Sequence, residues 1–121
     1  MSSTSFVKKK IKLKNKFLGF FMANLTIVYW RDIPAQLIIG TGRKAKKRKL
    51  PEKYEKAIDR CAMKVGAKDS ESYLQGWRKK NIPLLNHGED AINREASKIE
   101  QEYSDIKLLS LIINNGWDEE V

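Results

Sequence analysis

Two short apolar runs separated by a polar bend organise the N-terminal half of the chain. Residues 25–30 (Leu-Thr-Ile-Val-Tyr-Trp) are rich in β-branched and aromatic side chains, which is typical of a strand. Pro34 cannot donate a hydrogen bond to a sheet and disfavours helix for the residue before it, so the strand is expected to break within residues 31–35. Residues 37–39 supply a second short strand, which ends at the glycines of residues 40–42. Because two strands alone are marginally stable, the pattern predicts a hairpin that packs on helices or pairs with another chain.

Apolar residues at three- and four-residue spacing follow the hairpin and predict a first helix. Pro51 and Glu52 suit its start, because proline fits the first turn and a carboxylate stabilises the positive end of the helix dipole. Gly66 stands where a helix commonly ends. The residues of its apolar face are Tyr54, Ala57, Ile58, Cys61, Ala62 and Val65.

Three further helices are expected after this one. The second opens at residues 69–71, carries Tyr73, Leu74 and Trp77 on one side, and frays at 79–81. The third begins near Glu89 and has Ile92, Ala96, Ile99 and Tyr103 on one face. The last has a cap at residues 104–105, ends at 115–116, and carries Ile106, Leu108, Leu109, Ile112 and Ile113. A strand at 108–113 is the alternative, but the residues at both ends favour a helix.

These elements predict one domain of the α+β class, with an N-terminal β-hairpin packed against three to four α-helices. The length of 121 residues is enough for one domain to bury a core without disulfides or metal. We divide the chain into a basic extension (1–21), a single domain (22–117) and an acidic tail (118–121).

The net charge of +9 is concentrated at the N-terminus. Residues 1–21 contain six lysines and no acid, so removing these charges leaves +3 for the rest. Lysines followed by the apolar residues 17–30 imitate a signal peptide, but no cleavage site follows, and the run is shorter than the roughly 20 residues of a membrane span. A basic arm for nucleic acid or anionic lipid is a second interpretation. We favour a third, an over-extended gene start with translation beginning at Met22.

Cysteine and histidine content disfavours several classes of site. One cysteine (Cys61) and one histidine (His87) argue against a structural zinc, an iron–sulfur cluster and a histidine-based catalytic triad, so we expect no metal and no cofactor. The absence of a cysteine framework fits a reducing compartment and predicts a cytoplasmic protein. Cys61 lies on an apolar helix face, where a small buried hydrophobe is expected rather than a reactive thiolate.

The bend of the hairpin gathers the densest group of recognition-type side chains, namely Trp30, Arg31, Asp32 and Gln36. An exposed guanidinium beside a tryptophan could bind a carboxylate or a phosphate. The alternative is a structural turn in which Asp32 caps the backbone and Arg31 pairs with it on the surface. Neither a partner base nor a nucleophile lies nearby in the sequence, which argues against catalysis at the bend.

A basic run follows the second strand: Arg43, Lys44, Lys46, Lys47, Arg48 and Lys49. Six positive charges before a helix could neutralise several phosphates of RNA or DNA. The glycines of residues 40–42 do not complete a phosphate-binding loop motif, and no aromatic residue interleaves the run for base stacking. A solvated, mobile loop is the alternative.

Several segments resemble the bacterial "virulence factor" domain family. They are Thr26-Ile-Val-Tyr-Trp-Arg-Asp-Ile-Pro-Ala-Gln36, Gly42-Arg43, Ala57-Ile-Asp-Arg-Cys-Ala-Met63 and Tyr73-Leu-x-x-Trp77. The resemblance implies a small cytosolic module, found alone or at the C-terminal end of proteins with a NifU-like scaffold domain and helical repeats. It implies no catalytic residues, because the family's name reports a phenotype. It also implies a start close to Met22.

The leading hypothesis is therefore a non-catalytic accessory or protein-interaction module that recognises a partner through the bend. Partner binding or self-association through the exposed edge of the hairpin is expected, and no membrane span is expected. A nucleic-acid-binding protein that uses residues 43–49 is the alternative. An accessory subunit that completes the active site of a partner enzyme is a further one.

Overall fold

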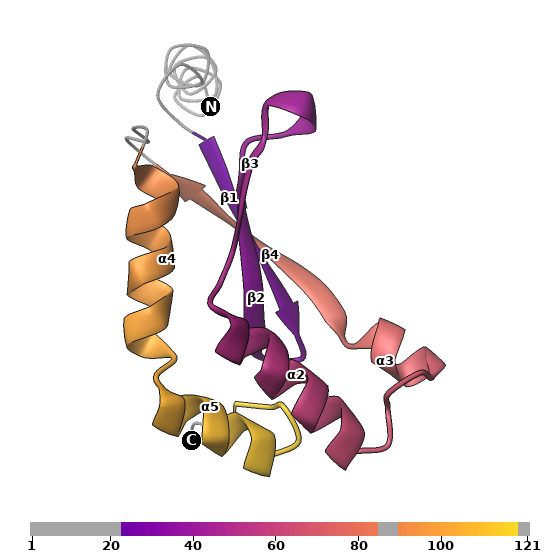
Figure 1. The fold of residues 1–121 in the computed structure, drawn as a ribbon. Helices are drawn as coiled ribbons and strands as arrows, with labels where there is room; N and C mark the ends of the chain where they lie inside the picture. The colour runs from indigo at the N-terminus through magenta and orange to yellow at the C-terminus, as the bar shows by residue number, and fades with distance from the viewer. Residues whose placement is uncertain (1–22, 85–89, 119–121) are drawn as a thin grey trace, which may run out of the picture.

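The domain is an antiparallel four-stranded sheet with helices on one face and at one end (Figure 1). A computed structural model describes residues 23–84 and 90–118, and in these ranges the sheet has the strand order β3-β2-β1-β4 and is accompanied by four α-helices. This arrangement confirms the α+β class. The predicted N-terminal extension, the Met22 start and His87 lie outside the described residues.

The predicted hairpin is formed by β1 (Ala23–Trp30) and β2 (Ile33–Ile39). The prediction of a break through Ala35 is wrong, because only Arg31 and Asp32 separate the strands and Pro34 lies inside β2. The register between the strands shifts between Val28 and Tyr29, so Ala35 is an extra residue in β2. Such a bulge is one of the places where a sheet accepts proline.

Two strands that the sequence pattern did not predict flank the hairpin. β3 (Lys46–Lys49) pairs with β2, and β4 (Trp77–Leu84) pairs along the whole of β1. The prediction of a loop over the basic run and of a fraying helix at 79–81 is therefore wrong. Both hairpin strands lie in the interior of the sheet, so the expected pairing of a partner with the hairpin edge is corrected as well.

Three predicted helices are confirmed, and the second is much shorter than predicted. Their bounds are α2 (Glu52–Lys64), α4 (Ala91–Glu102) and α5 (Asp105–Ile113). Gly66 follows α2 with a φ of 70°, and the Ser104 side chain caps α5 by accepting from the Lys107 N–H, as the sequence predicted. α3 (Glu71–Gln75) stops before Gly76, where an added Cβ would lie 2.5 Å from the Trp30 indole nitrogen.

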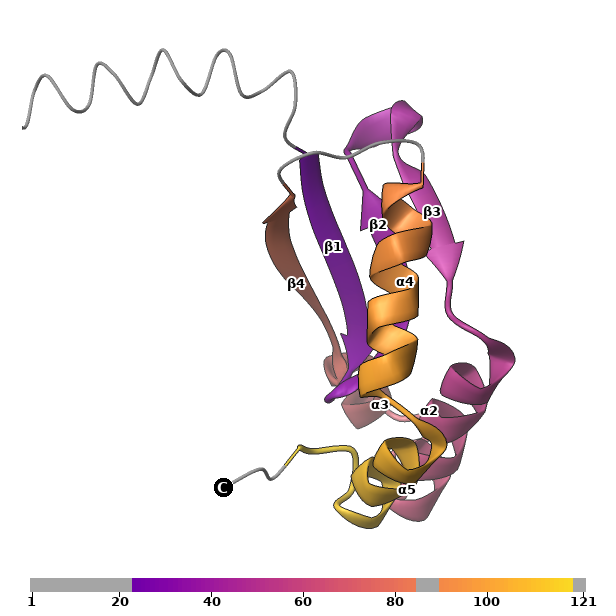
Figure 2. The ribbon, with the colours of Figure 1, turned by 90° about the vertical axis from the view of Figure 1, so that its left-hand side faces the viewer.

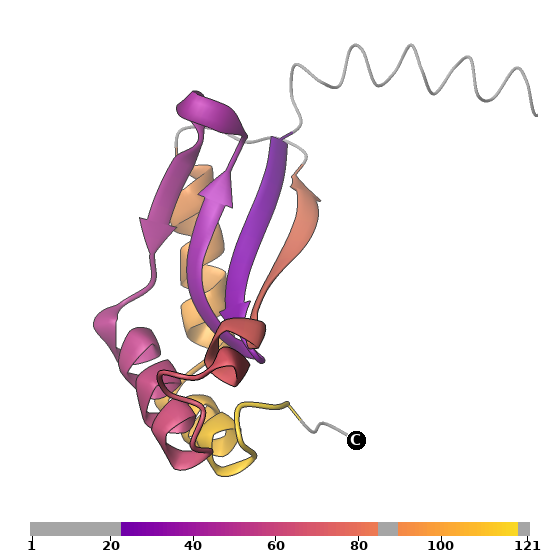
Figure 3. The ribbon, with the colours of Figure 1, turned by 90° about the vertical axis from the view of Figure 1, so that its right-hand side faces the viewer.

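Part of the core lies between one face of the sheet and α4, which runs along the strands in Figure 2, and the same buried cluster continues onto α2 and α5. Apolar side chains of β1 and β2 on that face are buried against those of α4: Leu25, Ile27, Leu37, Ile39, Ile92, Ala96 and Ile99. Figure 3 shows the opposite face, where α3 and α2 lie at the end near the hairpin bend. In the described ranges, no helix covers the rest of that face, and we call it the open face.

Candidate functional site

The bend between β1 and β2 joins three segments of the chain. Arg31 adopts a φ of 54°, a left-handed conformation that is uncommon for a residue with a side chain. Its N–H donates to the carbonyl of Gly76 at 2.7 Å, and the Asp32 N–H donates to the carbonyl of Gly116 at 2.8 Å. The backbone of the turn therefore ties the hairpin both to the start of β4 and to the segment after α5.

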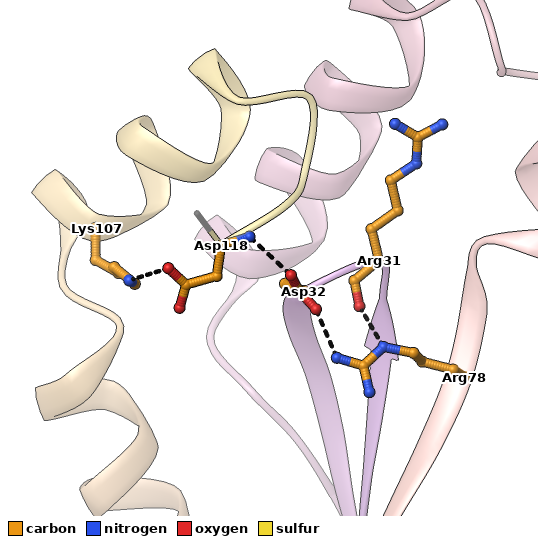
Figure 4. Close-up of polar contacts among 5 residues, drawn as sticks. All are labelled: Arg31, Asp32, Arg78, Lys107 and Asp118. Carbon is orange, nitrogen blue, oxygen red and sulfur yellow. Dashed lines mark hydrogen bonds and ion pairs between the residues drawn. The ribbon is translucent and has the colours of Figure 1, made fainter. Parts of the chain in front are cut away.

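Both carboxylate oxygens of Asp32 accept hydrogen bonds within the molecule (Figure 4). Arg78 donates to Oδ1 at 2.6 Å, and the backbone N–H of Asp118 donates to Oδ2 at 2.7 Å. Arg78 also donates from Nε to the carbonyl of Arg31 at 2.8 Å, and Lys107 pairs with the Asp118 carboxylate at 2.9 Å. Asp32 thus pairs with Arg78 of β4 rather than with Arg31, which corrects the sequence-based interpretation of that pair.

The guanidinium of Arg31 lies between two indole rings. It is 5.0 Å from the ring centroid of Trp30 and 5.3 Å from that of Trp117, within the range of a cation–π interaction. Its NH1 donates to the carbonyl of Asn115 at 2.6 Å. Arg31 therefore holds the segment that follows α5 against the hairpin.

Trp30 is fully buried, so its side chain is not accessible to a partner at the bend, whereas the sequence-based recognition hypothesis requires such access. Its indole N–H donates to the carbonyl of Tyr73 at 2.8 Å. Arg31 and Asp32 are partly exposed, but their polar groups are engaged by β4 and by the C-terminal segment. Among the four residues proposed at the bend, Gln36 alone lies on the open face.

Strand geometry divides the six cations predicted to form one basic patch. Arg43 and Lys44 lie in a short 3-10 turn (Gly42–Lys44), Lys46 and Arg48 lie on the α4 side of β3, and Lys47 and Lys49 lie on the open face. Arg48 donates to the Asn93 side chain and pairs with Glu100 at 3.7 Å, so it helps to fasten β3 to α4.

Two rows of side chains cross the open face. Paired residues of antiparallel strands point to the same side, so the register defines each row. One row is Lys49, Gln36, Val28 and Lys79, and the next is Lys47, Ile38, Thr26 and Asn81. Thr26 Oγ1 donates to Asn81 Oδ1 at 2.8 Å. The fold thereby adds Lys79 of β4 to two lysines of the basic run, on the opposite edge of the same face.

A cleft of about 800 Å³ lies at the end of the open face nearest the bend. Sheet residues form its floor, α2 forms one wall, and α3 with the start of β4 forms the other. The lining residues that the later argument uses are Val28, Gln36, Lys49, Glu55, Tyr73 and Trp77. We call this concave site the sheet–α2 cleft.

The aromatic wall of the sheet–α2 cleft continues into the core. The Tyr73 ring stacks at a tilt on Trp30 with a centroid distance of 5.8 Å, and Trp77 packs edge-on against Tyr73 at 6.0 Å. Trp30 is buried, Tyr73 is partly buried, and Trp77 is 37% exposed. A rigid, buried base therefore presents one exposed tryptophan to the cleft.

The opposite wall carries charges of both signs on the outer face of α2. Lys56 pairs with Glu52 at 3.5 Å, and Asp59 pairs with Lys68 at 2.7 Å. Glu55 also lines the sheet–α2 cleft and is exposed. The cleft thus offers an apolar aromatic surface beside hydrogen-bonding groups that can donate and accept, a combination suited to a peptide or another polar chain.

The cysteine of the chain, Cys61, does not line this cleft. Cys61 is fully buried, as predicted, and burial raises the pKa of its thiol, so the thiol stays protonated and is a poor nucleophile. Across residues 23–84 and 90–118, no group of three or more His, Cys, Asp or Glu side chains could hold a metal ion. No helix in the same ranges is long and apolar enough to cross a membrane.

Sequence reasoning missed Trp77, Lys79 and Arg78 as surface or junction residues. The helical pattern places Trp77 on the apolar side of the second predicted helix and Lys79 at its fraying end, and it gives no role to Arg78. Their alternation along a strand, with Trp77 and Lys79 on one side and Arg78 on the other, is the signal that would have separated them. It becomes readable only once β4 is known to be a strand.

Comparison with known protein families matched residues 28–112 to the family described as "Virulence factor". Comparisons with curated proteins and with solved structures found no match. The matched region covers more than half of the chain and includes the bend, most of the open face, α2 to α4 and most of α5. It extends the sequence resemblance through most of α5. The chain therefore belongs to the virulence factor family.

Proposed function

We propose that this chain is a non-catalytic protein-interaction module that holds a segment of a partner protein in the sheet–α2 cleft. The observation that carries the proposal is the exposed Trp77, supported from behind by Tyr73 and Trp30, beside an open sheet face. Tryptophan and tyrosine on a rigid base are the side chains that most often dominate the binding energy of an interface.

The polar groups of the cleft support a peptide as the ligand. Lys49 and Glu55 both line the cleft, so an acidic side chain of a bound segment could pair with Lys49 and a basic one with Glu55. Gln36 on the floor can both donate and accept hydrogen bonds. An apolar side chain of the partner segment would pack on Trp77, while the backbone and flanking residues of that segment would contact Lys49, Glu55 and Gln36.

Affinity capture from cells with the full chain as bait tests the proposal. Trp77→Ala and Glu55→Arg should each reduce capture of the specific partner about tenfold or more, as expected when a central contact is lost. Leu74→Ala is the matched control, because Leu74 is 68% exposed on α3 and does not line the cleft. Wild-type capture by both folded cleft variants would overturn the proposal. If the captured partner is an enzyme, and if its activity requires Trp77 of this chain, the module is an accessory subunit of that enzyme.

Binding of a single-stranded nucleic acid along the open face is a second candidate. The observation that favours it is that Lys47, Lys49 and Lys79 lie on one face of the sheet, with Lys79 and Trp77 on the strand opposite the basic strand. Phosphates could follow the lysines while a base stacks on the indole, and the aromatic residue that the basic run lacks comes from β4.

Titration with single-stranded RNA and DNA at several salt concentrations tests this candidate. Three phosphate contacts predict a slope of about −2 for log affinity against log salt. Lys79→Glu should weaken binding, whereas Lys98→Glu, a change of equal charge on the exposed side of α4, should have a smaller effect. Lack of binding at low salt, or binding without salt dependence, would exclude it.

A further inference from the structure

α5 exposes a stripe of large apolar side chains. Ile106, Leu109 and Ile113 are 82%, 50% and 63% exposed. Their spacing of three and four residues places them on one side of the helix, whereas Leu108 and Leu111 are buried toward the core. Three adjacent exposed apolar residues on a nine-residue helix are more than scattered surface hydrophobes.

A groove between α5 and α2 adjoins this stripe. It has a volume of about 330 Å³, and its apolar lining is Ala57, Leu108, Leu109 and Ile112. Figures 1 and 2 both show the two helices side by side at the end of the molecule near the bend. We call the groove together with Ile106 and Ile113 the α2–α5 groove.

The rim of the α2–α5 groove is basic. Lys53, Lys56 and Arg60 line it from α2, at spacings of three and four residues that place them along one side of that helix. The acidic residue in the lining is Asp105, which is paired with Lys53 at 2.7 Å. Lys64 extends the same side of α2 and donates to the carbonyls of Ile112 and Ile113 at the end of α5.

We propose that the α2–α5 groove docks an acidic amphipathic helix of a partner protein. The apolar face of such a helix would cover Ile106, Leu109 and Ile113, and its carboxylates would face Lys56 and Arg60. A second copy of this chain fits less well, because it would bring a second basic rim toward the first. A nucleic acid fits less well because it would leave the apolar stripe uncovered.

Binding at the α2–α5 groove does not depend on the function proposed for the sheet–α2 cleft. The sheet–α2 cleft and the α2–α5 groove both border α2, and Lys56 and Arg60 line both of them. Residues of α5 belong to the groove alone, so substitutions there separate the two sites. Ile106 is the most exposed of them, and replacing it by a polar residue leaves the core untouched.

Fluorescence anisotropy with a synthetic peptide tests the proposal. The probe is a labelled peptide of about 18 residues, five helical turns, with leucines on one face and glutamates on the other. The full chain should bind it about tenfold or more tightly than a scrambled peptide of the same composition and than a version with lysine in place of glutamate. Ile106→Asp and Leu109→Asp should each reduce affinity by a similar factor, and binding should weaken with salt.

Controls decide between the possible occupants. Leu74→Asp changes an exposed apolar residue outside the groove and should leave binding of the acidic peptide unchanged. Equal binding of all three peptides, or full binding by Ile106→Asp, would overturn the proposal. So would binding of anionic phospholipid vesicles through Ile106 without binding of the peptide, or a dimer of the free chain that Ile106→Asp dissociates.

Discussion

Replacing Asp32 by alanine should strongly destabilise the domain, although the residue lies at a surface bend. The substitution removes the acceptor for Arg78 on one side and the acceptor for the backbone N–H of Asp118 on the other. It therefore loosens β4 and the C-terminal segment together. Arg31, whose guanidinium rests on Trp117 of that segment, would lose part of its packing as well.

The size of the effect follows from the two contacts. A hydrogen bond to a charged acceptor contributes about 1.5 kcal/mol at the low end of its range, and this low end suits an exposed residue such as Asp118. The ion pair with Arg78, whose side chain is 44% exposed, contributes at most about 1 kcal/mol because solvent screens it. Together they predict a loss of up to about 2.5 kcal/mol, equivalent to a decrease in Tm of up to about 10–20 °C for a domain of this size.

Urea denaturation followed by tryptophan fluorescence measures this loss. Lys56→Ala is the control, because it breaks an exposed pair with Glu52 and should change the unfolding free energy by less than about 0.5 kcal/mol. In an Arg78→Ala background, the cost of Asp32→Ala should fall by about 1 kcal/mol, the share of the ion pair. If Asp32→Ala costs no more than Lys56→Ala, the bend does not hold the three segments together as described.

Four further predictions concern the core. Gly76→Ala should destabilise the fold by about 1–3 kcal/mol, because the added Cβ would lie 2.5 Å from the Trp30 indole nitrogen. A urea unfolding midpoint equal to that of the wild type would show that Gly76 and Trp30 are not in such close contact. Tyr54→Phe should cost about 1–2 kcal/mol, because the carbonyl of Tyr103 loses a buried donor at 2.6 Å. Burial also raises the pKa of Tyr54 to about 12, so the folded chain keeps a proton that the unfolded chain loses near pH 10. The free energy of unfolding should therefore fall as the pH rises from 10 to 12, and it should fall less steeply in Tyr54→Phe. A thiol reagent should label Cys61 only in denaturant, and rapid labelling of the native protein would show that its burial is incomplete.

The helices that the sequence predicted well are those whose stability is encoded by local periodicity. In α2 and α4 the apolar residues recur at helical spacing, and the buried positions found in the structure include nearly all of those expected. The cap at Ser104 and the glycine after α2 are equally local signals. Burial of one helix face leaves a pattern in the sequence whatever the helix packs against.

The two outer strands have no such pattern. β3 and β4 are exposed at most positions, so their side chains need not alternate between apolar and polar. Their position is decided by backbone hydrogen bonds to β2 and β1, which the types of side chain do not report. Lysine, arginine and proline on these strands are typical of sheet edges that resist pairing with other chains.

By itself, the sequence determined the α+β class, the hairpin, three of the helices, the burial of Cys61 and the family resemblance, because each of these depends on residues close together in the chain. The tertiary structure alone decided what the bend does. Asp32 meets Arg78 and Asp118 at separations of 46 and 86 residues, so a cluster that resembled a recognition site forms an internal junction. The same long-range pairing placed Lys79 and Trp77 on the face of the sheet that carries Lys47 and Lys49, at its opposite edge, and it gave α5 a basic neighbour in α2.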